Sequence, residues 1–239
     1  MSHGEHSAVD PRMIQADFDR SAALSGERWD HNSHYHPFLL QHLPPRCESV
    51  LDVGCGTGAF ARVLAGRSDR VLALDLAPQM IRVARERSQG FSTIDFQVAD
   101  VLDWDWPEGR FDCIASIATL HHLPLEAMVR KMRAALRVGG TLLILDLFAQ
   151  DGLSDALMAL LAVPPSLILR TARTGRLRAP RRTCGLGGAW APRFLAHPSP
   201  GAAGLCRCPT GAHVRRHLFW RYSVVWHKGT DHPEEMESV

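Results

Sequence analysis

The segment 50–58, VLDVGCGTG, holds the most specific arrangement of chemically informative residues in the chain. Glycines at Gly54, Gly56 and Gly58 remove the side chains that would keep a ligand from the backbone, and they allow a tight turn from a strand into a helix. Asp75 follows seventeen positions after Gly58. A carboxylate there can accept hydrogen bonds from both hydroxyls of a ribose. The spacing therefore predicts a site for a ligand that contains adenosine.

The charge of the loop indicates which ligand this is. Asp52 stands at the start of the loop, ahead of the first glycine. A carboxylate is unfavourable beside the pyrophosphate of a dinucleotide, but it suits the ammonium and sulfonium groups of S-adenosylmethionine. The Lys and Ser/Thr of a phosphate-binding P-loop are absent, because Ala59 follows Gly58. We therefore expect S-adenosylmethionine as the cofactor and regard ATP hydrolysis as disfavoured.

A second acidic position, Asp100, follows the third expected strand and fits recognition of the amino group of adenine. Further expected cofactor contacts are the apolar Leu76, Met80, Val101 and Ile117, and Cys55, a small residue that the tight loop accepts.

The elements that position these residues alternate between strand and helix. Strands are expected at 50–53, 71–74, 94–98, 113–116 and 141–147, and helices at 59–64, 78–87 and 124–136, the last closed by Gly139-Gly140. This alternation predicts an α/β fold with a doubly wound parallel sheet and helices on both faces. The segment 213–228, HVRRHLFWRYSVVWHK, predicts a terminal hairpin with a turn near residues 220 and 221.

With these segments in this order, residues 48–148 resemble the class I, Rossmann-like S-adenosylmethionine-dependent methyltransferases. The segments that carry the resemblance are 50–58, LALDLAPQMI at 72–81, FQVADVLDW at 96–104, FDCIASIATLHHLP at 111–124 and LRVGGTLLILDLF at 136–148. The resemblance implies that Asp52, Gly54 and Gly56 lie at the methionine moiety, Asp75 at the ribose and Asp100 at adenine. It also implies that the terminal hairpin is an antiparallel strand pair that closes a mostly parallel seven-stranded sheet.

Methyl transfer needs an acceptor atom about 3 Å from the methyl carbon, so positioning supplies much of the rate and a base is optional. His121 and His122 follow the fourth expected strand and are the candidates for a base. Such residues lie at the carboxyl edge of the sheet, where ligands bind in these folds. The alternative is that the two histidines only shape the site or pack on the next helix.

The N-terminal run WDHNSHYH, residues 29–36, could close over the cofactor. Trp29, His34 and Tyr35 are its candidate substrate contacts, and aromatic rings there could face the sulfonium. The histidines of this run are expected to be solvated surface residues, and no metal is expected.

Composition narrows the class of protein. The longest apolar stretch, 153–169, is interrupted by Asp155 and by Pro164 and Pro165, so no membrane span is expected. No secretory leader is recognised, the six cysteines form neither a disulfide framework nor a zinc module, and a cytoplasmic location is expected. The net charge of +2 conceals a block, 156–230, with 12 basic and no acidic side chains.

Four regions are expected: an N-terminal helical lid at 1–45, the cofactor-binding core at 46–150, an irregular basic insert or substrate lid at 151–211, and a hairpin with an acidic tail at 212–239. Three explanations compete for the basic block: a nucleic-acid contact, a lid over the substrate, or two compensating frame changes around 181–209. A nucleic-acid partner is disfavoured, because Ala118-Thr119-Leu120-His121 stands where amino-methylating enzymes of nucleic acids place an Asn-Pro-Pro-Tyr-type motif.

The sequence thus predicts a methyltransferase that acts at oxygen, nitrogen or activated carbon of a small molecule. The alternatives are a protein that binds the cofactor without turnover and, from another enzyme class, a nicotinamide oxidoreductase. Neither the acceptor nor the oligomeric state can be deduced from the sequence.

Overall fold

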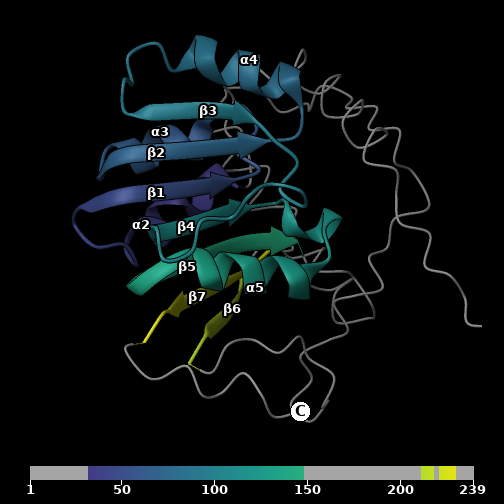
Figure 1. Cartoon of the computed structure of the whole chain (residues 1–239). Helices are drawn as coiled ribbons and strands as arrows, with labels where there is room; N and C mark the ends of the chain where they lie inside the picture. Colours follow the sequence, from purple (N-terminus) through teal and green to yellow (C-terminus); the bar gives the residue numbers. More distant parts are fainter. Residues whose placement is uncertain (1–31, 148–210, 218–220, 230–239) are drawn as a thin grey trace, which may run out of the picture.

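The computed structural model describes residues 32–147, 211–217 and 221–229. The strands in these segments form one seven-stranded sheet (Figure 1). The strand order is β3-β2-β1-β4-β5-β7-β6. Strands β1 to β5 are parallel, and β7 pairs antiparallel with both β5 and β6. The predicted α/β fold with a C-terminal antiparallel pair is confirmed. The strands are β1 Cys47–Val53, β2 Ser68–Asp75, β3 Ile94–Val98, β4 Phe111–Ile117, β5 Leu136–Leu147, β6 His213–His217 and β7 Arg221–His227.

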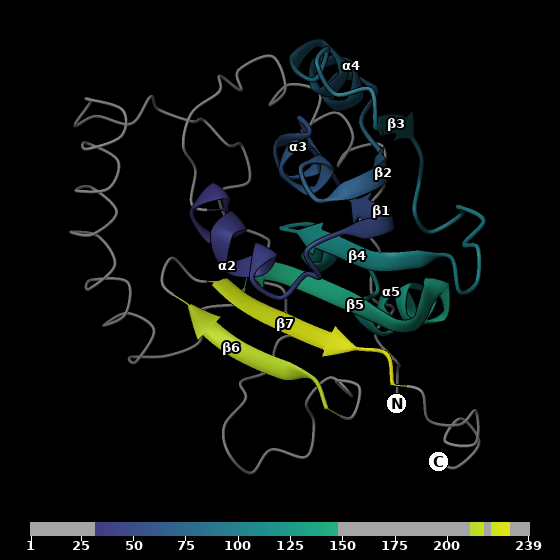
Figure 2. The same ribbon diagram turned by 90° about the vertical axis from the view of Figure 1, so that its left-hand side faces the viewer.

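Helices cover both faces of the sheet (Figure 2). Residues of α2, α3 and α4 belong to the buried cluster on one face, and residues of α5 belong to the cluster on the other. None of the described helices is long and apolar enough to cross a membrane. The helical elements are η1 Ser33–Tyr35, α2 His36–Leu40, α3 Ala59–Ala65, α4 Pro78–Arg87, η2 Leu120–His122 and α5 Leu125–Ala135.

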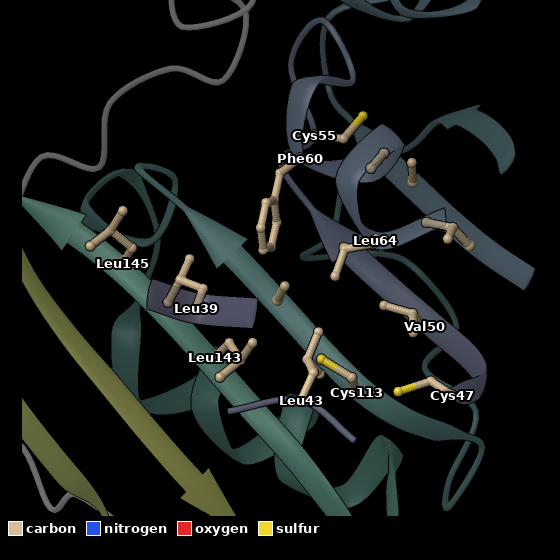
Figure 3. Close-up of a cluster of buried hydrophobic side chains, with 14 of the residues drawn as sticks. Leu39, Leu43, Cys47, Val50, Cys55, Phe60, Leu64, Cys113, Leu143 and Leu145 are labelled. Atoms are coloured by element: carbon tan, nitrogen blue, oxygen red, sulfur yellow. The ribbon is translucent and has the colours of Figure 1, made fainter. Parts of the chain in front are cut away.

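Burial on two faces explains why the central strands are almost continuously apolar. In Figure 3, Leu39 of α2 and Phe60 and Leu64 of α3 lie over Val50 of β1 and Leu143 of β5. The five-residue helix α2 is too short to be stable alone. Its buried face is therefore held by the same core as the sheet.

Strand β5 begins five residues earlier than the sequence predicts. Its first residue, Leu136, pairs with Phe111 of β4, and the register shifts before Cys113 pairs with Thr141. Gly139 takes a left-handed conformation with φ of 78°, and its N–H donates to the carbonyl of Lys228. The glycine pair therefore lies inside an irregular strand and does not end the helix, because neighbouring strands provide partners for its backbone.

The chain order places a topological switch point between β1 and β4. From β1 the chain passes outward through β2 to β3, and then returns to β4 on the other side of β1. Ligands of open α/β sheets bind at the carboxyl ends of the strands at such a point. The segments after β1 and β4 are therefore the two walls of the expected crevice.

Candidate cofactor and active site

The glycine loop leaves β1 against the end of β2. The N–H groups of Gly54 and Cys55 both donate to the carbonyl of Leu74, at 2.8 and 2.9 Å. Gly54 and Gly56 have φ of 73° and 53°, the left-handed region in which a side chain is strained. A Cβ at Gly56 would have no atom within 4 Å. The loop is therefore open to a ligand at Gly56 among the described residues.

Asp75, the last residue of β2, lies beside this opening. Its Oδ2 accepts a hydrogen bond from the N–H of Gly56 at 2.8 Å, and its Oδ1 accepts one from Ala77 at 2.9 Å. One carboxylate thus joins the glycine loop to the start of α4. The structure brings together the two features from which the sequence predicts an adenosine site.

Asp52 lies within β1, and its side chain is buried, with 1% exposed. Its Oδ2 has no hydrogen-bond partner in the described part of the chain. Burial, and secondly the charge of Asp75, raise the pKa of Asp52 to about 7, although a hydrogen bond from the backbone of Ala61 opposes this shift. A cation would relieve the repulsion between the two carboxylates, and an anionic pyrophosphate would increase it. The site therefore fits a cationic ligand.

The remaining expected cofactor residues lie along the same edge. Asp100 follows β3, and its Oδ1 accepts a hydrogen bond from Leu102 at 2.9 Å, so this carboxylate also orders its own turn. The thiol of Cys55 belongs to the buried cluster, which leaves only its backbone for a ligand. Among the apolar candidates, Met80 and Val101 are buried, and Leu76 and Ile117 are half-buried.

The segment after β4 forms the other wall. Ala118 has φ of 52°, unusual for a residue with a side chain, and its N–H donates to the carbonyl of Leu145 at 2.8 Å. The hydroxyl of Thr119 donates to the carbonyl of Ile117 at 3.1 Å and lies 3.4 Å from the carbonyl of Gly54. Sequence reasoning missed Thr119, because its contact with the glycine loop spans 65 residues.

His121 and His122 lie together in η2, at the carboxyl edge where the sequence places them. Their ring centroids are 3.9 Å apart. The Nδ1 of His121 lies 2.6 Å from Oδ1 of Asp146, whose side chain is 1% exposed. Burial, and secondly the proximity of His121, lower the pKa of His122 to about 4, with Asp146 opposing this shift. The sequence identified both histidines but not the contact between His121 and Asp146.

The N-terminal candidates lie partly within and partly outside the described residues. Trp29 lies outside the described residues. Tyr35 is 7% exposed, and its ring packs against His34 at 4.9 Å and against His217 of β6 at 4.8 Å. Burial raises the pKa of the Tyr35 phenol to about 12, with Arg221 opposing the shift. Tyr35 is therefore a neutral packing residue between the N-terminal segment and β6.

The basic block is described only where it forms β6 and β7. The guanidinium of Arg215 lies 5.7 Å from the ring centroid of Phe38, and Nε of Arg221 donates to Oδ1 of Asn32 at 2.8 Å. Nζ of Lys228 donates to the carbonyl of Leu136 at 2.7 Å. These three cations thus contact the protein itself. The segment 181–209, to which the frame-change hypothesis applies, lies outside the described residues.

No group of three or more His, Cys, Asp or Glu side chains in residues 32–147, 211–217 and 221–229 is arranged to hold a metal ion.

Part of the chain is similar to known methyltransferases. Residues 50–140 match the family model described as a methyltransferase domain. Ubiquinone biosynthesis O-methyltransferases from Xanthomonas axonopodis pv. citri and Xanthomonas campestris pv. campestris are 32% and 33% identical to this chain over 143 residues. Each alignment covers 54% of this chain and 60% of the relative. The chain thus spans less than two thirds of these relatives.

Two solved structures support the fold alone. One is a chain in the complex of the Haloferax volcanii Trm112 methyltransferase activator with a methyltransferase, with TM-score 0.53, 23% identity, and coverage of 57% of this chain and 61% of that chain. The other is the [4+2]-cyclase SpnF, with TM-score 0.52, 18% identity, and coverage of 61% and 63%. Because one fold carries different reactions, the chemistry must be argued from the site.

Proposed function

We propose that the chain is a class I S-adenosylmethionine-dependent methyltransferase that transfers a methyl group from S-adenosylmethionine to a small-molecule acceptor, and the match of residues 50–140 to a methyltransferase domain supports this. The observation that carries the proposal is the hydrogen bond of 2.8 Å from Gly56 to Asp75, which joins an open glycine loop to the expected ribose acid. The buried Asp52 beside them favours a cation. The same charges disfavour a nicotinamide dinucleotide.

Bound S-adenosylmethionine would supply an electrophilic methyl group on a sulfonium. The glycine loop and Asp52 would hold its methionine part, Asp75 its ribose, and Asp100 its adenine, with Leu76, Met80, Val101 and Ile117 as apolar neighbours. The chain's own task is then to place the acceptor and exclude water, because orientation supplies much of the rate of such a displacement.

Oxygen is the favoured acceptor atom, although nitrogen and activated carbon remain in the proposal. Support comes from the similar proteins, which are named as O-methyltransferases. Trp29 and His34 remain proposed substrate contacts. We also propose a cytoplasmic enzyme whose partner is a small molecule and not a nucleic acid, and the protein contacts of Arg215, Arg221 and Lys228 support this.

Calorimetric titration of the full chain with S-adenosylhomocysteine, beside NAD, tests the proposal. We expect binding of S-adenosylhomocysteine and none of NAD. An Asp75→Ala variant should bind about 10- to 100-fold more weakly, because hydrogen bonds to a charged group are worth about 1.5–3 kcal/mol. Asp69→Ala is the matched control, since Asp69 lies near the other end of β2, pairs with the exposed Arg46, and should leave the affinity unchanged.

Binding of NAD alone would replace the methyltransferase with the oxidoreductase alternative. Equal affinities of the wild-type and Asp75→Ala chains would refute the ribose assignment. Binding of S-adenosylhomocysteine, without methyl transfer to any acceptor in a broad panel, would support the alternative of a cofactor-binding protein without turnover.

A further inference from the structure

One buried carboxylate holds both the ring and the backbone of His121. Oδ1 of Asp146 lies 2.6 Å from Nδ1 of His121 and accepts the N–H of Leu147 at 2.7 Å, while Oδ2 accepts the N–H of His121 at 3.0 Å. Two contacts to one residue fix both its position and the plane of its ring. Asp146 therefore holds His121 as well as the backbone at the end of β5.

On the basis of the proposed function, we propose that Asp146 is a positioning residue that orients His121 as the base for a neutral hydroxyl group of the acceptor. Both oxygens of Asp146 already accept backbone N–H groups, so we assign Nδ1 of His121 as the donor in this pair. The neutral imidazole then has its lone pair on Nε2. That atom can take a proton, and the imidazolium formed is stabilised by the adjacent carboxylate.

The geometry selects His121 over His122. The ring of His121 contacts the carboxylate directly, and its side chain is 16% exposed, so the ring is ordered without being sealed off. The ring of His122 lies 3.9 Å from the ring of His121, and its low pKa makes it a weak base near neutral pH. Its expected role is to pack against His121.

His121 and Asp146 also lie at the carboxyl edge of the sheet, where the cofactor is expected to bind. His121 follows β4 and Asp146 is near the end of β5, two adjacent parallel strands whose carboxyl ends share one edge. Thr119, two residues before His121, lies 3.4 Å from the carbonyl of Gly54 in the glycine loop. Thr119 therefore links the cofactor loop, across the switch point, to the segment that carries the proposed base.

Proton removal by His121 and methyl transfer together convert the hydroxyl acceptor into a methyl ether. The acceptor oxygen loses its proton to Nε2 of His121 and forms a bond to the methyl carbon. The bond from that carbon to sulfur breaks, and its electron pair remains on sulfur. The products are a methyl ether, S-adenosylhomocysteine and a proton that passes from His121 to solvent. A free amine needs no such base before transfer, which is why the pair favours a hydroxyl acceptor.

The first test needs no turnover. Nitrogen-15 NMR of the full chain should show His121 with its proton on Nδ1, the signal being assigned by its loss in His121→Asn. In Asp146→Asn this preference should be lost. Asp112→Asn is the matched control, because Asp112 lies near the start of β4 and its carboxylate accepts two backbone N–H groups, from Glu48 and Ser49, elsewhere in the same sheet. It should leave the His121 signal unchanged.

The second test is kinetic and uses catechol as the hydroxyl probe and benzylamine as the amine probe. We expect the wild-type chain to methylate catechol, and His121→Asn and Asp146→Asn each to lower kcat about 10²-fold with little change in KM. If Asp146 acts through His121, the double variant should be no slower than His121→Asn alone. Each variant should bind S-adenosylhomocysteine as the wild-type chain does.

Three outcomes would overturn the proposal: a proton on Nε2 of His121 in the wild-type chain, full kcat toward catechol in Asp146→Asn, or methylation of benzylamine but not of catechol. Additive losses in the double variant would assign Asp146 a role separate from His121. Failure of the wild-type chain to bind S-adenosylhomocysteine would instead overturn the proposed function, so the two failures are distinguishable.

Discussion

Thr119 occupies the volume that a side chain at Gly54 would need. A Cβ at Gly54 would lie 2.7 Å from the Cβ of Thr119 and closer still to its Oγ1 and Cγ2 atoms. Gly54 also has φ of 73°. The first glycine of the loop is therefore required twice, once by its backbone conformation and once by the close approach of the segment after β4.

Gly54→Ala should therefore destabilise the protein by more than backbone strain alone. A left-handed backbone costs a residue with a side chain about 1–2 kcal/mol, and the overlap with Thr119 adds to that cost. We expect a lower Tm and at least tenfold weaker binding of S-adenosylhomocysteine, measured by thermal unfolding and calorimetry. Gly109→Ala is the control for backbone strain alone, since Gly109 has φ of 55° and open space around it. Equal effects of the two variants would refute the role of Thr119.

The raised pKa of Asp52 predicts how stability depends on pH. Its folded value of about 7 lies above the ordinary value of 3.8, so the folded protein binds more protons than the unfolded chain between these values. The free energy of unfolding contributed by this group therefore falls as pH rises through that window. Asp52→Asn should raise Tm relative to wild type at pH 8 more than at pH 5. A difference in Tm that is the same at both pH values would contradict the shift.

The same group predicts a pH-dependent affinity. A bound cation favours the ionised form of Asp52, whose fraction increases as pH rises through about 7. S-adenosylmethionine should therefore bind more tightly at pH 8 than at pH 6, by several-fold. Asp52→Asn should bind more weakly than wild type at pH 8 and lose this dependence. Titrations of both chains at the two pH values check this, and an equal pH dependence in both would assign it to another group.

Leu39 links the short helix α2 to the core, because its side chain is fully buried. Leu39→Ala should cost about 2–5 kcal/mol of the free energy of unfolding, which lowers Tm by roughly 5–15 °C for a chain of this size. Val138→Ala is a control, since Val138 is 64% exposed and should change Tm little. A Tm for Leu39→Ala like that of the control would show that α2 does not contribute to the folded core.

Lys228 caps the end of α5. Its Nζ donates to the carbonyls of Leu136 at 2.7 Å and Arg133 at 3.0 Å. A cation at a helix C-terminus satisfies free carbonyls and interacts favourably with the helix dipole. Lys228→Met should therefore lower the free energy of unfolding by about 1–2 kcal/mol, measured by denaturant titration. Arg130→Met removes an exposed charge from the same helix, and an equal loss there would argue against the cap.

The order and type of the elements could be predicted from the sequence because both depend on near neighbours. Apolar runs and helical periodicity predict β3 and α4 with the observed bounds. The predicted bounds of β5 were wrong at its start, because the pairing of Leu136 with Phe111 depends on a neighbouring strand. Residues at the ends of elements are the ones whose structure is set by distant partners.

For the candidate site, the sequence by itself determined the glycine loop, Asp75 and the acidic Asp52, because residue type and spacing along one strand and turn encode them. Only the tertiary structure decided that Asp52 is buried and partly unpaired, that Thr119 closes over Gly54, and that Asp146 holds His121. The contact of Thr119 with Gly54 and that of His121 with Asp146 join neighbouring strands through residues that are 65 and 25 positions apart in the sequence. Strand order and register bring these residues together, and neither can be deduced from the local sequence pattern.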